Sequence, residues 1–599
     1  MSVTDLQDVA WDLEPLVEGE GEAGADRMLA EADERAAAFA ERYAGRVAEL
    51  DGAELATAMG ELERISELVG RAGNYAHLRF SVDTMDPANG ALVARVNEKA
   101  TAVETKLLFF ELDWAGLDDE RAEELLAADG LDTSRHHLRM LRRYRPHLLT
   151  EPEEKIMTEK AVSGREAWTR LFSEQTSAIM VDVPDEGEPV KLDVALARLM
   201  SPDREVRRTT AEAVTAALDP GLRTRAYIYN TIAQDKATDD RLRHYPTWLA
   251  SRNLANEASD ESVEALIEAV RRNYDLPQRW YRLKARLLGI DRLADYDRMA
   301  AVADEEVTVE WPDATEIVLG AYNDFSPVLA DTARRFFDER WIDAPVRPGK
   351  RGGAFCAYAV PSVHPYVMLN YTSRRRDVLV LAHELGHGVH AALAQPRGIL
   401  EQHTPLTLAE TASVFGETLV FGRLLEAAET PASRLALLAE NIEGSIATVF
   451  RQVAMNRFEQ EVHTARRERG ELSVERFGEL WERTQAEMLG DAVEITPGYK
   501  TWWSYVPHFI GAPGYVYAYA YGQLLALSVY GRYLEEGESF VPRYLELLSA
   551  GGSRSPEELA AIAGLDLTDP QFWSNGLELV RGQLSAAEEA ASAAESSSG

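Results

Sequence analysis

Apolar residues recur at intervals of three and four through most of residues 20–150, for example in ADRMLAEADERAAAFAERYAG. This spacing puts them on one face of a helix and therefore predicts a series of amphipathic helices. Glycine and proline interrupt the pattern, as in DPANG at 86–90 and EPEE at 151–154. No fixed-period repeat is visible, so the pattern favours a helical bundle over a solenoid.

The pattern changes at residues 178–194, where apolar and polar residues alternate on either side of PDEGEP. Alternation around a turn-forming segment predicts a β-hairpin. Helical spacing resumes near residue 195 and continues to about 340, with breaks expected at Pro220, Pro277 and Pro312.

A second β-prone stretch, GAFCAYAVPSVHPYVMLNY at 353–371, predicts a short sheet just before another helical stretch. Further helices are expected over about 405–490 and 513–565. The final segment, AAEEAASAAESSSG at 586–599, has no large apolar side chain and predicts a flexible tail.

The predicted fold class is therefore mainly α, with two helical domains and a small β-sheet. A chain of 599 residues is too long for one ordinary core. We assign residues 1–200 to an N-terminal helical domain that includes the hairpin. Residues 201–585 form the second domain, in which the candidate chemistry lies, and the tail follows.

Charge and composition exclude several classes of protein. The chain has 100 acidic and 63 basic residues and a formal net charge of −37, which argues against nucleic-acid binding. No run of eighteen apolar residues is present, and the acidic N-terminus does not resemble a signal peptide, so no membrane association is expected. Cys356 is the only cysteine, which fits a reducing cytoplasm. No sequence feature specifies an oligomeric state.

The segment LAHELGH at 381–387 carries the strongest chemical signal. His383 and His387 lie four residues apart, about one helical turn, so both imidazoles leave the same face and can bind one metal ion. Glu384, beside the first histidine, can reach a water on that metal. This H-E-x-x-H arrangement is the zinc-peptidase signature, in which the glutamate acts as general base.

A catalytic zinc site needs a third protein ligand, and the candidates downstream are Glu401, His403, Glu410 and Glu417. Glu410 lies in a largely apolar helical segment that begins after Pro405. Burying an unpaired carboxylate there would be costly, and a metal would offset the cost. Glu417 follows seven residues later on nearly the same face and could orient a ligand imidazole.

HELGHGVH followed by LAETASVFGE resembles the oligoendopeptidase F branch of the thimet-oligopeptidase family. The opening VAWDLEPL is also similar to the start of the bacterial oligoendopeptidases. The resemblance implies that His383, His387 and Glu410 bind Zn²⁺. It also implies that Glu384 is the general base and that Glu417 supports a ligand.

Tyrosines are concentrated in YVPHFIGAPGYVYAYAY at 505–521. Glycine and proline predict a flexible loop ahead of a helix that carries most of these tyrosines. Tyr515 and Tyr519 would share one helical face and Tyr517 and Tyr521 another, so one pair is expected to pack in the core.

The family resemblance implies that His508 and Tyr515 assist the transition state and that Tyr519 is a further active-site tyrosine. The loop is longer by a couple of residues than in thimet-type relatives. Gly522 stands where those relatives have a third tyrosine. Tyr519 and Tyr521 therefore stay contenders for the role of Tyr515 as the donor to the oxyanion.

Together these features predict a zinc-dependent oligoendopeptidase that hydrolyses internal bonds of short, unstructured peptides. The resemblance implies that the two helical domains face each other across a deep substrate channel. One alternative is a zinc carboxypeptidase, in which Arg374, Arg375 or Arg376 would bind the substrate carboxylate. Another is a zinc-stabilised protein that binds peptides without cleaving them, against which Glu384 argues.

The remaining features carry weaker expectations. The β segment could bind an extended peptide along a strand edge, or it could only support the site from below. His136 and His137 are interpreted as solvated, and His364 as a groove or core residue, with no catalytic role for any of the three.

The acidic excess makes one prediction for solution behaviour. Repulsion between like charges destabilises a compact state and is screened by salt, so the composition favours a salt-adapted, halophilic protein over one from a high-GC genome with an acidic surface. The melting temperature should rise as KCl increases from about 0.1 M to about 1 M, because the screening length falls from about 10 Å to about 3 Å. A melting temperature independent of KCl would contradict halophily.

Overall fold

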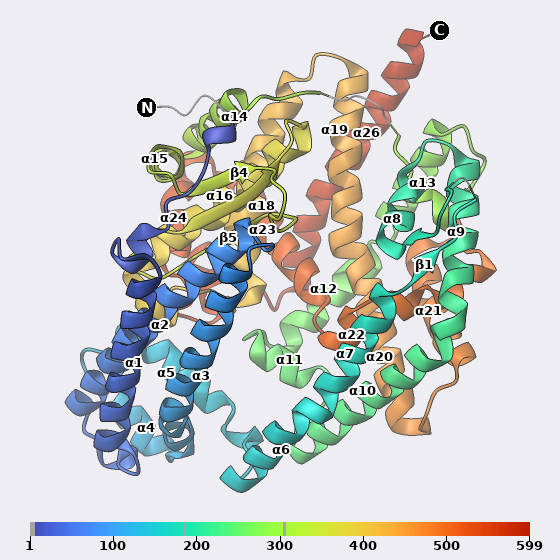
Figure 1. Cartoon of the computed structure of the whole chain (residues 1–599). Coiled ribbons are helices and arrows are strands. Elements are labelled where there is room, and N and C mark those ends of the chain that lie inside the picture. The colour runs from blue at the N-terminus through green and yellow to red at the C-terminus, as the bar shows by residue number, and fades with distance from the viewer. Residues whose placement is uncertain (1–5, 185, 303–306, 599) are drawn as a thin grey trace. The chain divides into compact units, whose positions relative to one another are not determined.

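The computed structural model describes residues 6–184, 186–302 and 307–598, and most of them are helical (Figure 1). The chain forms two compact units, each built from segments that are far apart in the sequence. The first unit contains residues 1–145, 306–424 and 529–566, and the second contains residues 146–305, 425–528 and 567–599.

The first unit is mostly helical and includes one three-stranded sheet. Its helices are α1 Gly21–Tyr43, α2 Gly52–Val82, α3 Pro87–Gly116, α4 Asp119–Leu126, α5 Arg135–Arg143, α14 Trp311–Phe325, α15 Pro327–Asp338, α16 Arg375–Ala394, α17 Gly398–Glu401, α18 Leu406–Ala427, α24 Val541–Ser549 and α25 Pro556–Ile562. Its strands are β4 Ile342–Pro345, β5 Phe355–Ala357 and β6 Tyr366–Tyr371.

The second unit is also helical, with two small strand pairs. Its helices are α6 Glu151–Ser163, α7 Arg165–Ser177, α8 Leu192–Ala197, α9 Arg204–Leu218, α10 Leu222–Leu242, α11 Ala250–Ala255, α12 Asp260–Arg272, α13 Asp275–Leu287, α19 Pro431–Ser445, α20 Arg451–Arg469, α21 Val474–Leu489, α22 His508–Gly511, α23 Tyr517–Glu536 and α26 Pro570–Ser598. The C-terminal part of α23, from Val529, belongs to the first unit. Its strands are β1 Met180–Val181, β2 Val190–Lys191, β3 Leu293–Ala294 and β7 Val493–Glu494.

The amphipathic pattern of residues 20–150 becomes the bundle of α1, α2 and α3, which pack side by side (Figure 1). Their apolar faces meet in a core that includes Phe39, Ile65 and Trp114. The turn sequences set the helix starts, since Asp51 forms a capping box with α2 and Asp86 caps α3 ahead of a proline. The mainly helical fold class is confirmed.

The predicted sheet beside the histidine motif is also confirmed. Its strand order is β4-β6-β5, with β4 parallel and β5 antiparallel to β6. Strand β6 leads into α16 after three residues, and α16 packs against both β5 and β6. The sheet therefore fixes the start and the direction of the helix that carries His383 and His387.

In the second unit, β1 and β2 pair antiparallel with Met180 opposite Lys191, as the alternating pattern predicts. Helices α9, α10, α20 and α21 surround an aromatic core in which the Tyr229 ring lies parallel to the rings of Phe477 and Phe509. The chain between α21 and α23, which contains His508 and the tyrosine-rich segment, packs on this core.

The end of the chain differs from the sequence prediction. Residues 586–598, expected to form a flexible tail, continue helix α26, and Ala587 and Ala591 are buried. Small side chains allow α26 and α19 to pack closely, so the absence of large apolar residues does not prevent burial.

The two compact units also differ in their limits from the contiguous domains assigned to residues 1–200 and 201–585. Each unit draws on three stretches of chain, a feature that local patterns cannot reveal. The assignment of contiguous domains and the substrate channel between them stay predictions. Among the described residues, no helix is long and apolar enough to cross a membrane.

Candidate active site

Helices α16 and α18 build the centre of the candidate site. Gly386, inside the histidine motif, lies where the two helices cross, and a Cβ atom there would be only 2.6 Å from the Cα atom of Ser413. A methyl group cannot be accommodated at that distance from backbone, so glycine permits the crossing. The close approach brings Glu410 of α18 opposite the two histidines of α16.

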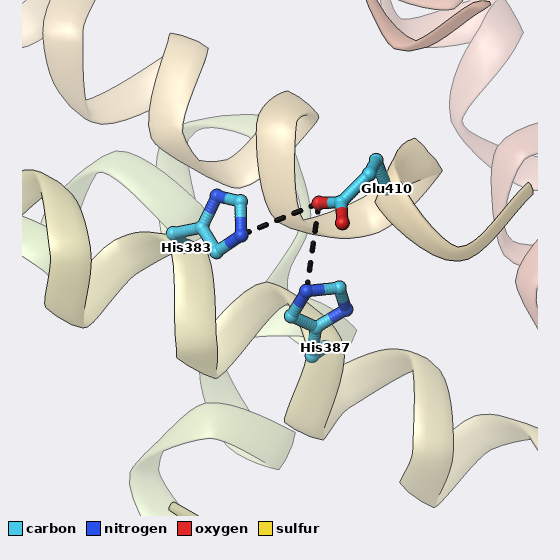
Figure 2. A group of neighbouring side chains, drawn as sticks. All are labelled: His383, His387 and Glu410. Carbon is cyan, nitrogen blue, oxygen red and sulfur yellow. Dashed lines mark ion pairs between the residues drawn. The ribbon is translucent and has the colours of Figure 1, made fainter. Parts of the chain in front are cut away.

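Three side chains converge at this crossing. The Oε2 atom of Glu410 lies 3.3 Å from Nε2 of His383 and 3.5 Å from Nε2 of His387. Figure 2 shows both imidazole rings directed at this one carboxylate oxygen. One donor atom from each of the three residues lies within 4.8 Å of the other two, a spacing suited to a single metal ion.

Further groups hold these three side chains in place. Glu417 Oε2 lies 3.1 Å from Nδ1 of His383, so it can accept that ring proton and leave Nε2 free to bind metal. The Ser413 hydroxyl donates a 2.7 Å hydrogen bond to Oε2 of Glu410. The backbone of Ala409 hydrogen-bonds the His387 ring.

The surroundings shift the pKa values of the two imidazoles in opposite directions. Burial opposes a charged His383, but hydrogen bonds to Glu410 and Glu417 outweigh it and raise the pKa of His383 to about 10. Burial lowers the pKa of His387 to about 4. His383 thus lies between two carboxylates, a position that favours positive charge and is equally suited to a bound cation.

The donor set fits zinc in its chemistry. Two neutral imidazole nitrogens and one carboxylate oxygen form a common ligand set of catalytic zinc, which keeps a further position for water. Although burial favours the neutral acid, the hydrogen bond from His383, the neighbouring His387 and the hydrogen bond from Ser413 lower the pKa of Glu410 to about 2. An anionic carboxylate at neutral pH suits a metal ligand.

Glu384 lies on the same helix as the histidines and is buried, with 7% of its surface exposed. Burial raises the pKa of Glu384 to about 7, and the backbone N–H of Cys356 on β5 acts against that rise. The carboxyl group therefore faces the edge strand of the sheet. Its environment gives it the proton affinity that a general base needs near neutral pH.

The other two candidate ligands have different partners. The Glu401 carboxylate accepts the backbone N–H groups of His136 and His137, at 2.7 and 3.3 Å, and so holds the first turn of α5. The His403 ring stacks on Tyr358, with the ring centroids 5.0 Å apart. Within the described part of the chain, neither residue belongs to the group of potential metal donors.

The interpretation of His136 as solvated is wrong, because the residue is buried beneath the contact with Glu401. The adjacent histidines His136 and His137 look exposed in the sequence, because the sequence does not show that the distant Glu401 carboxylate contacts their backbone. His137 is half-buried. His364 stacks on Trp341 with the ring centroids 4.3 Å apart, in agreement with a core or groove position.

The tyrosine-rich segment belongs to the second unit. Tyr517 and Tyr521 are fully buried, and their hydroxyls lie 2.7 Å from Asn253 Oδ1 and 3.2 Å from the Ser262 hydroxyl. The prediction that one tyrosine pair packs in the core is therefore confirmed for this pair. Its position in the core removes Tyr521 from the contenders for an oxyanion donor.

Tyr515 and Tyr519 are half-buried and lie close to His508. Nε2 of His508 is 3.2 Å from the Tyr519 hydroxyl, and the Tyr515 ring lies parallel to His508 with centroids 6.1 Å apart. Burial, reinforced by the charge of Arg451, lowers the pKa of His508. A neutral imidazole with two phenols forms a compact set of hydrogen-bond donors.

Sequence reasoning missed several supporting groups. Ser413 could have been inferred, since it lies three residues after Glu410 and i, i+3 side chains meet on a helix. The Tyr322 hydroxyl donates a 2.6 Å hydrogen bond to the Ala382 carbonyl just before the motif. No local pattern signals that contact, because Tyr322 lies on a distant helix.

Comparison with known proteins gives this site a family context. The chain is 26% identical over 544 residues to Oligopeptidase PepF of Bacillus subtilis, covering 88% of this chain and 80% of that protein. It is 25% identical over 548 residues to an Oligoendopeptidase F homolog of Lactococcus lactis, covering 90% of each chain.

Solved structures share the fold. A putative peptidase from Chlamydophila abortus matches with a TM-score of 0.87 at 24% identity over 98% of both chains. Oligoendopeptidase-F from Enterococcus faecium matches with a TM-score of 0.71 at 23% identity, over 94% of this chain and 98% of that one.

Two family models match the sequence. The model described as Oligopeptidase F matches residues 114–180. The model of peptidase family M3 matches residues 198–579, well over half of the chain and including every candidate ligand. The chain therefore belongs to peptidase family M3 and is a peptidase.

Proposed function

We propose that the protein is a zinc-dependent oligoendopeptidase that hydrolyses internal bonds of short, unstructured peptides. One observation carries the proposal: His383, His387 and Glu410 converge on one point in a family M3 chain, with Glu384 on the same helix. The names of the relatives, oligopeptidase and oligoendopeptidase F, support peptides as the substrate class.

In this proposal some residues of the site bind the metal and others transfer protons. A zinc ion held by the three donors would polarise the scissile carbonyl and acidify water. Glu384 takes a proton from the attacking water and later delivers it to the leaving amine. Glu417 keeps His383 in the tautomer that presents Nε2.

His508 and Tyr515 are proposed to donate hydrogen bonds to the oxyanion of the tetrahedral intermediate. Preorganised donors of this kind stabilise charge that develops only in the transition state. The family resemblance supports Tyr515, and the 3.2 Å contact between His508 and Tyr519 keeps Tyr519 as the other contender.

The carboxypeptidase alternative lacks a supporting observation. Arg374 and Arg376 are exposed at the start of α16. They lie about 10 Å or more along the helix axis from His383. Arg374 also has a helix-capping position, where its backbone N–H bonds to Asp377. A binding protein without activity would have no need for a buried acid such as Glu384 beside the donors.

A fluorescence-quenched peptide acetylated at its N-terminus and amidated at its C-terminus tests the proposal. The wild-type protein should cleave it internally, which a carboxypeptidase cannot do. Glu384→Gln should keep its zinc and lose about 10²- to 10⁴-fold in kcat, because the general base is gone. Glu426→Gln, at an exposed position of α18, is the matched control and should retain full activity. Wild-type turnover by Glu384→Gln would refute the role of the base.

Metal content tests the ligand set independently. Glu410→Ala should lose zinc, measured by atomic absorption after dialysis, since the remaining two imidazoles bind metal far less tightly. Glu417→Gln should weaken zinc affinity by about 10- to 100-fold, as expected for a partner of a ligand histidine. Full zinc occupancy in Glu410→Ala would move the third ligand elsewhere.

The two tyrosine contenders are separated by removing one hydroxyl at a time. Tyr515→Phe should lower kcat by about 10²-fold, the usual effect of losing one oxyanion donor, with zinc content unchanged. Tyr519→Phe should have the smaller effect. The reverse order would transfer the role to Tyr519.

A further inference from the structure

The turn before Tyr515 is held in an unusual backbone conformation. Gly514 is buried and has φ +76°, in the left-handed region that favours glycine. A Cβ atom at this position would lie 2.7 Å from Cδ1 of Leu249. The backbone just before Tyr515 is therefore packed directly on the segment that leads into α11.

Glu459 of α20 makes a buried side-chain hydrogen bond to the backbone of this turn. Its side chain is fully buried, and Oε1 accepts the backbone N–H of Gly514 at 2.9 Å. Its other oxygen, Oε2, has no hydrogen-bond partner within the described residues, and the charges of Arg252 and Lys236 act on the carboxyl group without a hydrogen bond to that oxygen. Burial raises the pKa of Glu459 to about 8.

A buried carboxyl group with a single hydrogen bond is costly, so its place in the core calls for a reason. The hydrogen bond to Gly514 supplies one. Loss of that acceptor would leave a buried N–H without a partner, and the turn could relieve the cost only by moving.

Movement of the turn would move Tyr515. The Tyr515 ring packs against the guanidinium of Arg252, at 5.9 Å from the ring centroid, and edge-on against Tyr519 at 5.1 Å. These ring contacts restrict the side chain only while the preceding backbone is fixed. Since a displacement of about 1 Å in a catalytic group can cost about 10²-fold in rate, the backbone anchor matters for turnover.

We propose that Glu459 is a positioning residue, which acts through the N–H of Gly514 to aim the Tyr515 hydroxyl at the reacting peptide. This inference rests on the proposed function and adds a residue to it. Glu459 does not touch substrate or metal in this proposal, so its removal should affect turnover without affecting zinc content.

Two substitutions of Glu459 distinguish the loss of its hydrogen-bond acceptor from a change in side-chain volume. Glu459→Gln keeps a carbonyl oxygen that can accept the Gly514 N–H, whereas Glu459→Met keeps the length and removes the acceptor. Glu459→Met should lower kcat by about 10-fold or more on the blocked peptide with KM changed less than about threefold. Glu459→Gln should retain at least half of the wild-type kcat.

Asn230 offers a matched structural control in the same unit. Its buried Oδ1 accepts the backbone N–H of Leu472 at 2.9 Å, and its Nδ2 group donates to the carbonyls of Leu472 and Ala226, so it also anchors a turn. Asn230→Leu should lower the melting temperature at least as much as Glu459→Met does and leave kcat near the wild-type value. An equal loss of kcat in both variants would show a general effect of destabilisation and overturn the proposal.

A double-mutant cycle with Tyr515→Phe provides the decisive measurement. If Glu459 acts through the Tyr515 hydroxyl, Glu459→Met should cause no further loss of kcat in the Tyr515→Phe background. If the fold-loss of kcat in the double variant equals the product of the two single losses, Glu459 does not act through the Tyr515 hydroxyl. A wild-type protein that does not cleave the blocked peptide would instead refute the proposed function, so the two failures are distinguishable.

Hydrogen exchange keeps the proposal testable if Glu459→Met does not fold. In the wild-type protein the Gly514 amide should exchange slowly, although it lies in a turn, because its acceptor is buried. Glu459→Gln should preserve that protection. Exchange of the Gly514 amide at the rate of an unprotected loop in the wild-type protein would overturn the proposal.

Discussion

The close crossing of α16 and α18 at Gly386 is the contact on which the site depends. One helix presents two imidazoles a turn apart, which alone hold a metal weakly. The second helix adds the carboxylate of Glu410, and it can do so only because no side chain separates the two backbones at the crossing. Sheet β4-β6-β5 fixes the start of α16. The packing of the two helices therefore decides whether the three side chains can share one metal ion.

The carboxyl groups of Glu410 and Glu459 lie in opposite electrostatic environments. Glu410 is half-buried, and hydrogen bonds and the nearby imidazoles lower its pKa. Glu459 is fully buried with one N–H donor, and burial raises its pKa against the charges of Arg252 and Lys236. The first environment suits a metal ligand, and the second suits a fixed acceptor for backbone.

Sequence patterns predicted the features that depend on residues close together in the chain. The spacing of His383 and His387 sets their common face, and the alternation around residues 178–194 sets the hairpin. Helical periodicity also predicted that one tyrosine pair packs in the core, and the structure identifies this pair as Tyr517 and Tyr521. Predicting Glu410 required one more inference. An acidic residue in an apolar helical segment is costly to bury, and a bound metal would offset that cost.

Long-range contacts account for what the sequence could not predict. His136 is buried because Glu401, 265 residues away, caps the start of its helix. Helix α26 continues past residue 586, where Ala587 and Ala591 are buried and Glu588 pairs with Arg279 of α13, a contact that the segment itself does not reveal. The contact between Glu459 and Gly514 joins positions 55 residues apart, and neither position carries a recognisable motif.

The span of chain that builds the donor group is short. His383 and Glu417, the outermost of the ligand and support residues, are only 34 positions apart, and α16 and α18 are near neighbours in the sequence. A cluster with such low contact order forms without waiting for distant segments to assemble. The three candidate donors therefore belong to one short stretch of the chain, so a metal held there would depend on α16 and α18 more than on segments distant in the sequence.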